Sequence, residues 1–176
     1  MSLEQAEANR LLCTPKKVWA DNRQQEEYYI NPFDETEIRL NLVECEDEDS
    51  SFLLKITKSE KRRIKVTLHH QENDSDFCLV RIDYNGSPHT NPVIPTELVP
   101  EHFLAFAGET ITDNHIHYHV EGYRSAQWAI PLEISDFQFK TLDNDEYSVT
   151  FADIITEFCK LINLKTRLTY QTKLLI

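Results

Sequence analysis

The chain has 176 residues, of which 40% are hydrophobic and 27% charged, a balance typical of one soluble globular domain. No stretch approaches 18 consecutive apolar residues, which excludes an ordinary membrane-spanning helix. With 30 acidic against 18 basic residues the formal net charge is −12, which argues against broad binding of nucleic acid through its phosphates.

Two features of the sequence bear on the compartment. The first ten residues, MSLEQAEANR, lack a basic segment followed by an apolar one, so we expect no secretory signal and a cytoplasmic location. The four cysteines are far apart and form no C-x-x-C pair. We therefore expect reduced thiols rather than disulfides or a zinc knuckle.

The N-terminal segment is expected to be helical. Ser2 and Gln5 have the spacing of a capping box, and a partial apolar stripe follows them. The Thr-Pro pair at 14–15 then suits the start of a second short helix, which would carry Val18 and Trp19.

In residues 27 to 84 the apolar residues recur with a period of two. In the run TEIRLNLVE, apolar residues at 38, 40 and 42 alternate with polar ones. Similar short runs precede and follow it, namely YYI, FLLKITK, RIKVTLHH and DFCLVRIDY. Only a few residues link most of these runs, which favours hairpins over helical crossovers. The pattern therefore predicts an antiparallel sheet with one solvated face.

The next segment interrupts this regularity. Four of the seven prolines fall in residues 87–112, so we expect a long irregular loop there until the run EHFLAF. Pro131, in the later run AQWAIPLEI, predicts an edge strand or a bulge.

The clearest helix lies in the C-terminal third. Thr150 and Asp153 have capping-box spacing. Apolar residues then recur at helical spacing, at Phe151, Ile154, Ile155, Phe158 and Ile162. The last run, RLTYQTKLLI, fits an edge strand or a tail. We therefore predict one α+β domain over residues 1–176, a mostly antiparallel sheet with N-terminal and C-terminal helices packed on one face.

The run HIHYHVE places three histidines at alternate positions of a predicted strand, with Ile116, Tyr118 and Val120 between them. Neighbouring side chains on one face of a strand are about 7 Å apart, so two of the imidazoles could hold one metal ion together with a ligand from elsewhere. His89 is the obvious third ligand, with Glu121 or Asp83 behind it. Three interpretations stay open, namely a solvated face, a catalytic or recognition site without metal, and a metal site.

The surrounding loops gather further polar and aromatic residues near this strand. His69 and His70, which end another strand, are expected to be solvated. Our candidate catalytic residues are His89 and His117, and we assign no metal ligand and no cofactor. The candidate binding residues are Asn91, His115, His119, Glu121, Tyr123, Arg124 and Trp128.

The same region carries a resemblance. The segments RIDYNGSPHTNP, HIHYHVEGY and WAIPL resemble a family of small bacterial and phage-borne proteins whose domain has no assigned function. The likeness rests on a Pro-His-x-Asn-Pro motif, a His-x-His strand, Glu-Gly-Tyr and Trp-Ala, and covers roughly residues 80–132. More residues separate Pro92 from the histidine strand than the family pattern leads us to expect. The resemblance implies no activity.

Two functions are consistent with the sequence. It contains no P-loop, G-x-G-x-x-G, G-x-S-x-G or H-E-x-x-H motif, so we expect an intracellular interaction or regulatory protein whose acidic surface and histidine-rich locus meet a protein partner. The alternative is a small ribonuclease-like or phosphoesterase-like enzyme, with His89 and His117 as its acid and base. We expect no membrane partner, and nucleic acid contact only at the basic run 58–65. The oligomeric state stays open.

Overall fold

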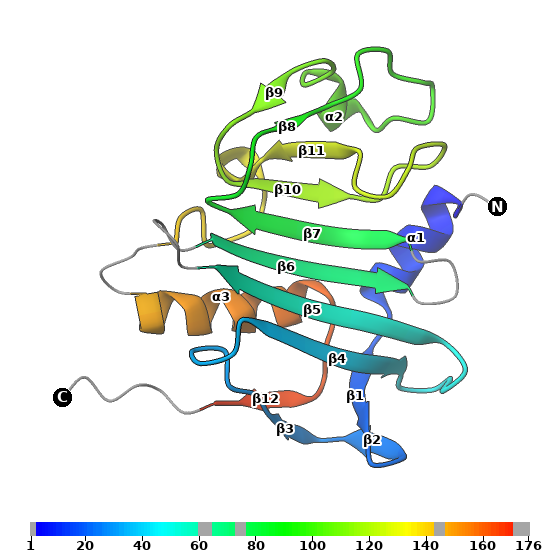
Figure 1. Ribbon diagram of the computed structural model, residues 1–176. Helices are drawn as coiled ribbons and strands as arrows, with labels where there is room; N and C mark the ends of the chain where they lie inside the picture. The colour runs from blue at the N-terminus through cyan, green and yellow to red at the C-terminus, as the bar shows by residue number, and fades with distance from the viewer. Residues whose placement is uncertain (1–2, 60–64, 73–76, 143–146, 171–176) are drawn as a thin grey trace.

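An eight-stranded antiparallel sheet dominates the computed structural model, which describes residues 3–59, 65–72, 77–142 and 147–170 (Figure 1). Its strands, in spatial order, are β11 (Trp128–Pro131), β10 (His115–Tyr118), β7 (Cys78–Tyr84), β6 (Lys65–Glu72), β5 (Ser51–Ser59), β4 (Glu37–Glu44), β1 (Lys16–Ala20) and β2 (Arg23–Gln25). The predicted antiparallel sheet is therefore confirmed.

Smaller elements complete the fold. Strand β3 (Glu27–Tyr29) pairs in parallel with β12 (Arg167–Thr169), and β8 (His89–Thr90) pairs antiparallel with β9 (Thr110–Ile111). The helices are α1 (Gln5–Cys13), α2 (Glu101–Leu104), α3 (Tyr147–Leu161) and the 3-10 helix η1 (Leu132–Ile134). That the terminal helices pack on one face stays a prediction. Within the described ranges, no helix has the length and apolar character needed to cross a membrane.

The core contains the alternate apolar residues of the strands. On β4, Ile38, Leu40 and Leu42 are buried, while Glu37 and Arg39 are exposed. The same core cluster includes Ala8 and Leu11 of α1 and the apolar stripe of α3. The predicted period of two and the predicted helical stripe are both confirmed.

The start of α3 differs from the prediction. The helix begins at Tyr147, so Thr150 lies inside it rather than at its cap. A capping-box pattern only marks side chains that could bind free amide groups. Once an earlier turn is helical, its carbonyls accept the amides that follow Thr150, and the cap has no role. At the other end of the chain, α1 begins at Gln5, and Ser2 lies outside the described residues.

The predicted second helix is wrong, because residues 16–20 form β1. This strand pairs with β4, with Val18 opposite Leu42. Cross-strand hydrogen bonds and burial of a β-branched residue outweigh the local Thr-Pro signal. Lys16 is fully buried, and its Nζ donates to the carbonyls of Leu12, Thr14 and Ile162, at 3.2, 2.7 and 3.1 Å. One ammonium group thus joins the chain after α1 to the chain after α3.

The placement of His70 also corrects the sequence analysis. Its ring is fully buried and stacks on Phe52, with centroids 5.5 Å apart, whereas His69 is partly exposed. Consecutive residues of a strand point to opposite faces, so both rings could not be solvated. By contrast, Pro131 lies on β11, the outermost strand of the sheet, as predicted.

Candidate functional site

The histidine strand β10 is an inner strand, paired with β7 on one side and β11 on the other. His115 and His117 are each only 3% exposed. Residues 86–89 and Ala126 line a pocket of about 350 Å³ together with these two rings. The interpretation of His115 and His117 as part of a solvated face is therefore wrong. The cover comes from loops elsewhere in the sequence, which the alternation of the strand does not reveal.

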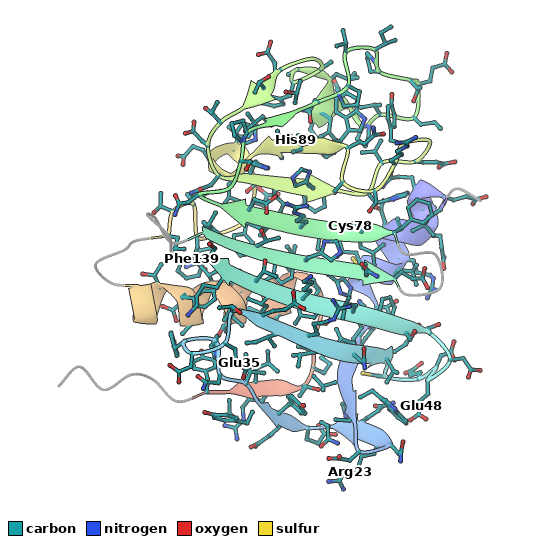
Figure 2. The ribbon with its side chains drawn as sticks, viewed as in Figure 1. Arg23, Glu35, Glu48, Cys78, His89 and Phe139 are labelled. Atoms are coloured by element: carbon teal, nitrogen blue, oxygen red, sulfur yellow. The ribbon has the colours of Figure 1, made fainter. Side chains whose placement is uncertain are left out.

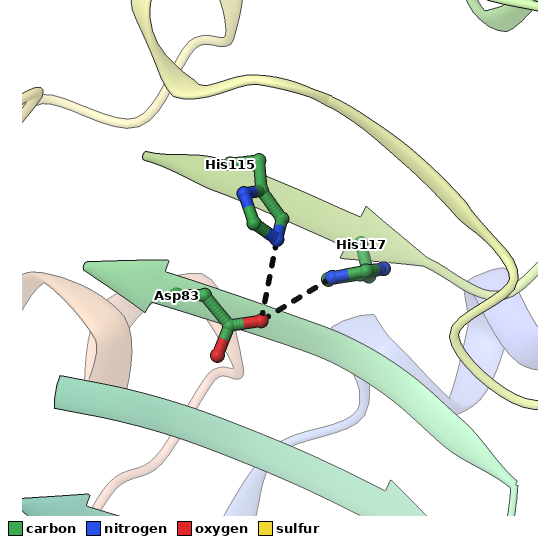
Figure 3. Close-up of side chains that lie close together, drawn as sticks. All are labelled: Asp83, His115 and His117. Atoms are coloured by element: carbon green, nitrogen blue, oxygen red, sulfur yellow. Dashed lines mark ion pairs between the residues drawn. The ribbon is translucent and has the colours of Figure 1, made fainter. Parts of the chain in front are cut away.

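A carboxylate from the neighbouring strand joins the two rings (Figure 3). Asp83 on β7 lies opposite His115 in the register. Its Oδ2 atom is 3.5 Å from His115 Nε2 and 3.3 Å from His117 Nε2. All three side chains are buried, and one donor atom from each lies within 4.8 Å of the others. These three residues, which we call the Asp-His centre, are the described group that could hold a metal ion.

Two further residues fix the Asp83 carboxylate. Thr67 Oγ1 donates to Oδ1 at 2.5 Å, and Arg81 donates to the same oxygen from Nε at 3.1 Å and from Nη2 at 3.0 Å. Arg81 Nε also lies 2.8 Å from Oδ2, within ion-pair distance. Burial alone would raise the pKa of Asp83. The hydrogen bond from His117, the Arg81 charge and the Thr67 hydroxyl outweigh burial, so the pKa lies well below its usual value. The carboxylate is therefore ionised at neutral pH.

His89 lines the same pocket from β8, near the β11 end of the sheet (Figure 2). Its ring centroid is 4.6 Å from that of His117, so the predicted catalytic pair is brought together. Its Nε2 is 3.0 Å from the Gln127 carbonyl, which can only accept, so in the neutral ring Nδ1 carries the lone pair. Burial lowers the pKa of both His89 and His117, which favours neutral rings at pH 7.

His119 does not join His115 and His117 at the pocket. The strand ends at Tyr118, and His119 Nε2 lies 2.8 Å from the carbonyl of Leu3, beside α1. Glu121 also binds α1, because its Oε2 accepts a hydrogen bond from the Gln5 amide at 2.9 Å. A carboxylate at a helix N-terminus is favourable both as an acceptor and as a charge. These two predicted binding residues attach a helix to the sheet and do not line the pocket of the Asp-His centre.

Three other predicted binding residues hold the loops in place. Asn91 is 2% exposed; its side-chain amide donates to the Ala129 carbonyl at 2.8 Å and accepts from the Ala129 amide at 2.9 Å. The Tyr123 hydroxyl accepts from the Thr96 amide at 2.8 Å. Trp128 is fully buried and packs edge-on against Tyr123. They position the pocket without lining it.

The remaining predicted residues lie apart from the pocket. Arg124 is exposed in the turn before β11, where its amide binds the Gln127 side chain. Of the basic run, residues 60–64 lie outside the described part of the chain. Lys58 is buried, and its Nζ donates to the Phe33 carbonyl.

Sequence reasoning missed Arg81 and Thr67. The signal was present, because the run CLVRIDY places Arg81 and Asp83 at alternate positions of an otherwise apolar strand. Two charged residues on one face of a central strand require partners on the adjacent strands. The partners themselves depend on the cross-strand register, which a single sequence does not contain.

Comparison with known proteins places the chain in a family. The model of a family of unknown function, DUF6978, matches residues 3–164. The chain belongs to this family. The comparisons with curated proteins and with solved structures found no match. The family membership agrees with the resemblance in the sequence and assigns no activity.

The Asn91 contacts lead to a stability prediction. Asn91→Ala would leave the amide and carbonyl of Ala129 without their partner, so we expect the free energy of unfolding to fall by about 2–4 kcal/mol. Urea denaturation measures this change. Asn41→Ala, at an exposed position of β4, is the matched control and should change stability by less than about 0.5 kcal/mol. Equal stability of the two variants would contradict a positioning role for Asn91.

Proposed function

We propose that this chain hydrolyses phosphate esters, with the Asp-His centre as its catalytic centre and His89 as the group that transfers protons. The observation that carries the proposal is a row of basic side chains that crosses the sheet and ends at this centre. A histidine-based phosphoesterase was one of the two functions consistent with the sequence.

The basic row follows from the register of the sheet. Five residues on five adjacent strands lie opposite one another, in the order Arg39, Lys55, His69, Arg81 and His117. Adjacent strands are about 4.8 Å apart, so the row extends over about 19 Å. Its first four members line one depression of about 390 Å³, which shares Thr67 and Arg81 with the pocket of the Asp-His centre.

The charges of the row suit an anionic substrate. Arg39, Lys55 and Arg81 are cationic, while burial lowers the pKa of His69 and favours its neutral ring. Two carboxylates lie beside these cations. Glu37 pairs with Lys55 at 2.9 Å and with Arg39 at 3.7 Å, and Asp83 pairs with Arg81 at 2.8 Å. Three cations on one sheet face are unexpected in a chain of net charge −12, and guanidinium groups are well matched to phosphate oxygens.

The chemistry requires a proton acceptor beside the phosphate. In the proposed reaction a water oxygen attacks phosphorus, and His89 Nδ1 takes the water proton as the new bond forms. The ester P–O bond breaks, and the departing oxygen receives that proton from the imidazolium. One water is consumed, and one alcohol and one phosphate product result. Arg81, bound to Asp83 through Nε and Nη2, offers further donors on Nη1 to the phosphate oxygens.

Hydrolysis of bis(4-nitrophenyl) phosphate and of a labelled single-stranded RNA tests the proposal, with the protein as purified and after addition of divalent cations. We expect His117→Gln and His89→Gln to lower kcat by at least about 100-fold. The double variant Arg39→Gln/Lys55→Gln should raise KM for RNA with little change in kcat. His102→Gln, at an exposed position on α2, is the matched control. No hydrolysis by the wild type, or equal hydrolysis by all variants, would refute the proposal.

A second candidate function is supported by a different surface. Val93, Ile94 and Leu98 are 75%, 81% and 50% exposed, although the Tyr123 hydroxyl holds their loop through Thr96 and Ile94. Large apolar side chains fixed in solvent are typical of protein interfaces. This apolar surface and the net charge of −12 support the function as an interaction protein that the sequence led us to expect, with a basic protein as the partner.

Pull-down from host extract at low and high salt tests this second function. We expect Ile94→Asp to abolish capture of a basic partner, and high salt to weaken capture by the wild type. Ile134→Asp, at an exposed isoleucine of η1, is the control and should capture the partner normally. Equal capture by both variants would count against this surface as the interface.

A further inference from the structure

We infer that Asp83, His115 and His117 bind one divalent metal ion in tetrahedral geometry, as zinc is bound. The inference deepens the proposed function, on whose catalytic centre it rests, by naming the ion at that centre. It replaces the ligand set suggested by the sequence, in which His89 was the third ligand.

The spacing of the donor atoms fits a small tetrahedral site. Zinc binds imidazole nitrogen and carboxylate oxygen at about 2.0–2.2 Å, so two ligand atoms of a tetrahedron lie about 3.3–3.5 Å apart. The Asp83 Oδ2 atom is 3.5 Å from His115 Nε2 and 3.3 Å from His117 Nε2. Neighbouring ligands of an octahedral site with bonds of the same length would lie only about 3.0 Å apart. The two distances from Asp83 therefore match tetrahedral rather than octahedral coordination, and the donor atoms of all three residues lie within 4.8 Å of one another.

The hydrogen bonding of His115 calls for a cation between the ring and the carboxylate. His115 Nδ1 is 2.8 Å from the carbonyl of Asp113, which can only accept, so Nδ1 carries a proton. In the neutral ring Nε2 then has a lone pair, and this lone pair faces the Asp83 carboxylate. A metal ion bound between the two relieves that repulsion. An imidazole that donates to a backbone carbonyl and binds metal through its other nitrogen is the usual arrangement of a zinc ligand.

The surroundings of Asp83 are those of an oriented ligand. Thr67 Oγ1 and Arg81 Nη2 both donate to Oδ1, so the carboxylate is held with Oδ2 toward the rings. Hydrogen bonds from outside the coordination sphere commonly orient carboxylate ligands in this way. Arg81 thus has two opposite effects on metal binding, because its hydrogen bonds orient the carboxylate while its charge repels the ion.

The fourth ligand position opens toward the pocket. Ser87, Pro88 and His89 line that pocket with the centre, and the proton on His89 Nε2 is committed to the Gln127 carbonyl. Three protein ligands with one open position distinguish catalytic from structural zinc sites. An ion bound here would therefore meet water or a substrate oxygen next to His89.

Metal analysis of the full chain, purified without a histidine tag and dialysed after loading with Zn²⁺, tests the inference. We expect about one equivalent of zinc in the wild type and in His89→Gln, and a loss of affinity of at least 10-fold in Asp83→Asn and His117→Gln. Loading with Co²⁺ should give the intense visible absorption of a tetrahedral ion. Circular dichroism verifies that each variant is folded.

Several outcomes would overturn the inference. These are less than about one-tenth of an equivalent in the loaded wild type, a weak octahedral cobalt spectrum, or equal losses in His89→Gln and His117→Gln. The result is separate from that of the hydrolysis assay. Zinc bound without phosphoesterase activity would refute the proposed function alone, whereas hydrolysis by a protein that takes up no zinc on loading would refute the metal site alone.

Discussion

The buried carboxylate of Asp83 is the charge on which the candidate site depends. An ionised carboxyl group taken out of water must be compensated by hydrogen bonds or by opposite charge. Here Thr67 on β6, Arg81 on β7 and the two imidazoles on β10 supply that compensation. The sheet therefore has a polar cluster across three adjacent strands at a place where apolar residues would otherwise be favoured. Such an arrangement is more typical of a functional site than of a stabilising core.

Loops far away in the sequence convert this cluster into a pocket. The paired hydrogen bonds between Asn91 and Ala129 hold the segment that begins with His89 against β11, the edge strand. Glu121 attaches α1 to the turn that follows β10. The polar residues around the histidine strand therefore divide into two groups. One group lines the pocket, and the other holds the surrounding loops and α1 against the sheet.

The elements that could be predicted from the sequence are those with a local cause. The alternation of Ile38, Leu40 and Leu42 follows from the pleat of one strand, and the stripe of α3 follows from the helical repeat. Residues 16–20 form a strand because β4 lies beside them, a contact that their own sequence does not contain. The local pattern therefore predicted the central strands of the sheet. It failed at β1, whose own sequence lacks a clear alternation and which forms a strand because it pairs with β4.

The site was predicted in part for the same reason. The alternation placed His115 and His117 on one face, and proximity in sequence suggested His89. Burial of the rings, the departure of His119 toward α1 and the central position of Asp83 all depend on register and on loop placement. These are non-local properties, so the sequence indicated the region and offered Asp83 only as an alternative ligand behind His89.

The most direct measurement of the central role of Asp83 is an NMR titration of the His117 ring in the metal-free wild type and in Asp83→Asn. The carboxylate is the hydrogen-bond partner that raises the pKa of His117 against the effect of burial. Its neutralisation should therefore lower the pKa of His117 further below the ordinary value. An unchanged or higher pKa of His117 in a folded Asp83→Asn protein would contradict the account.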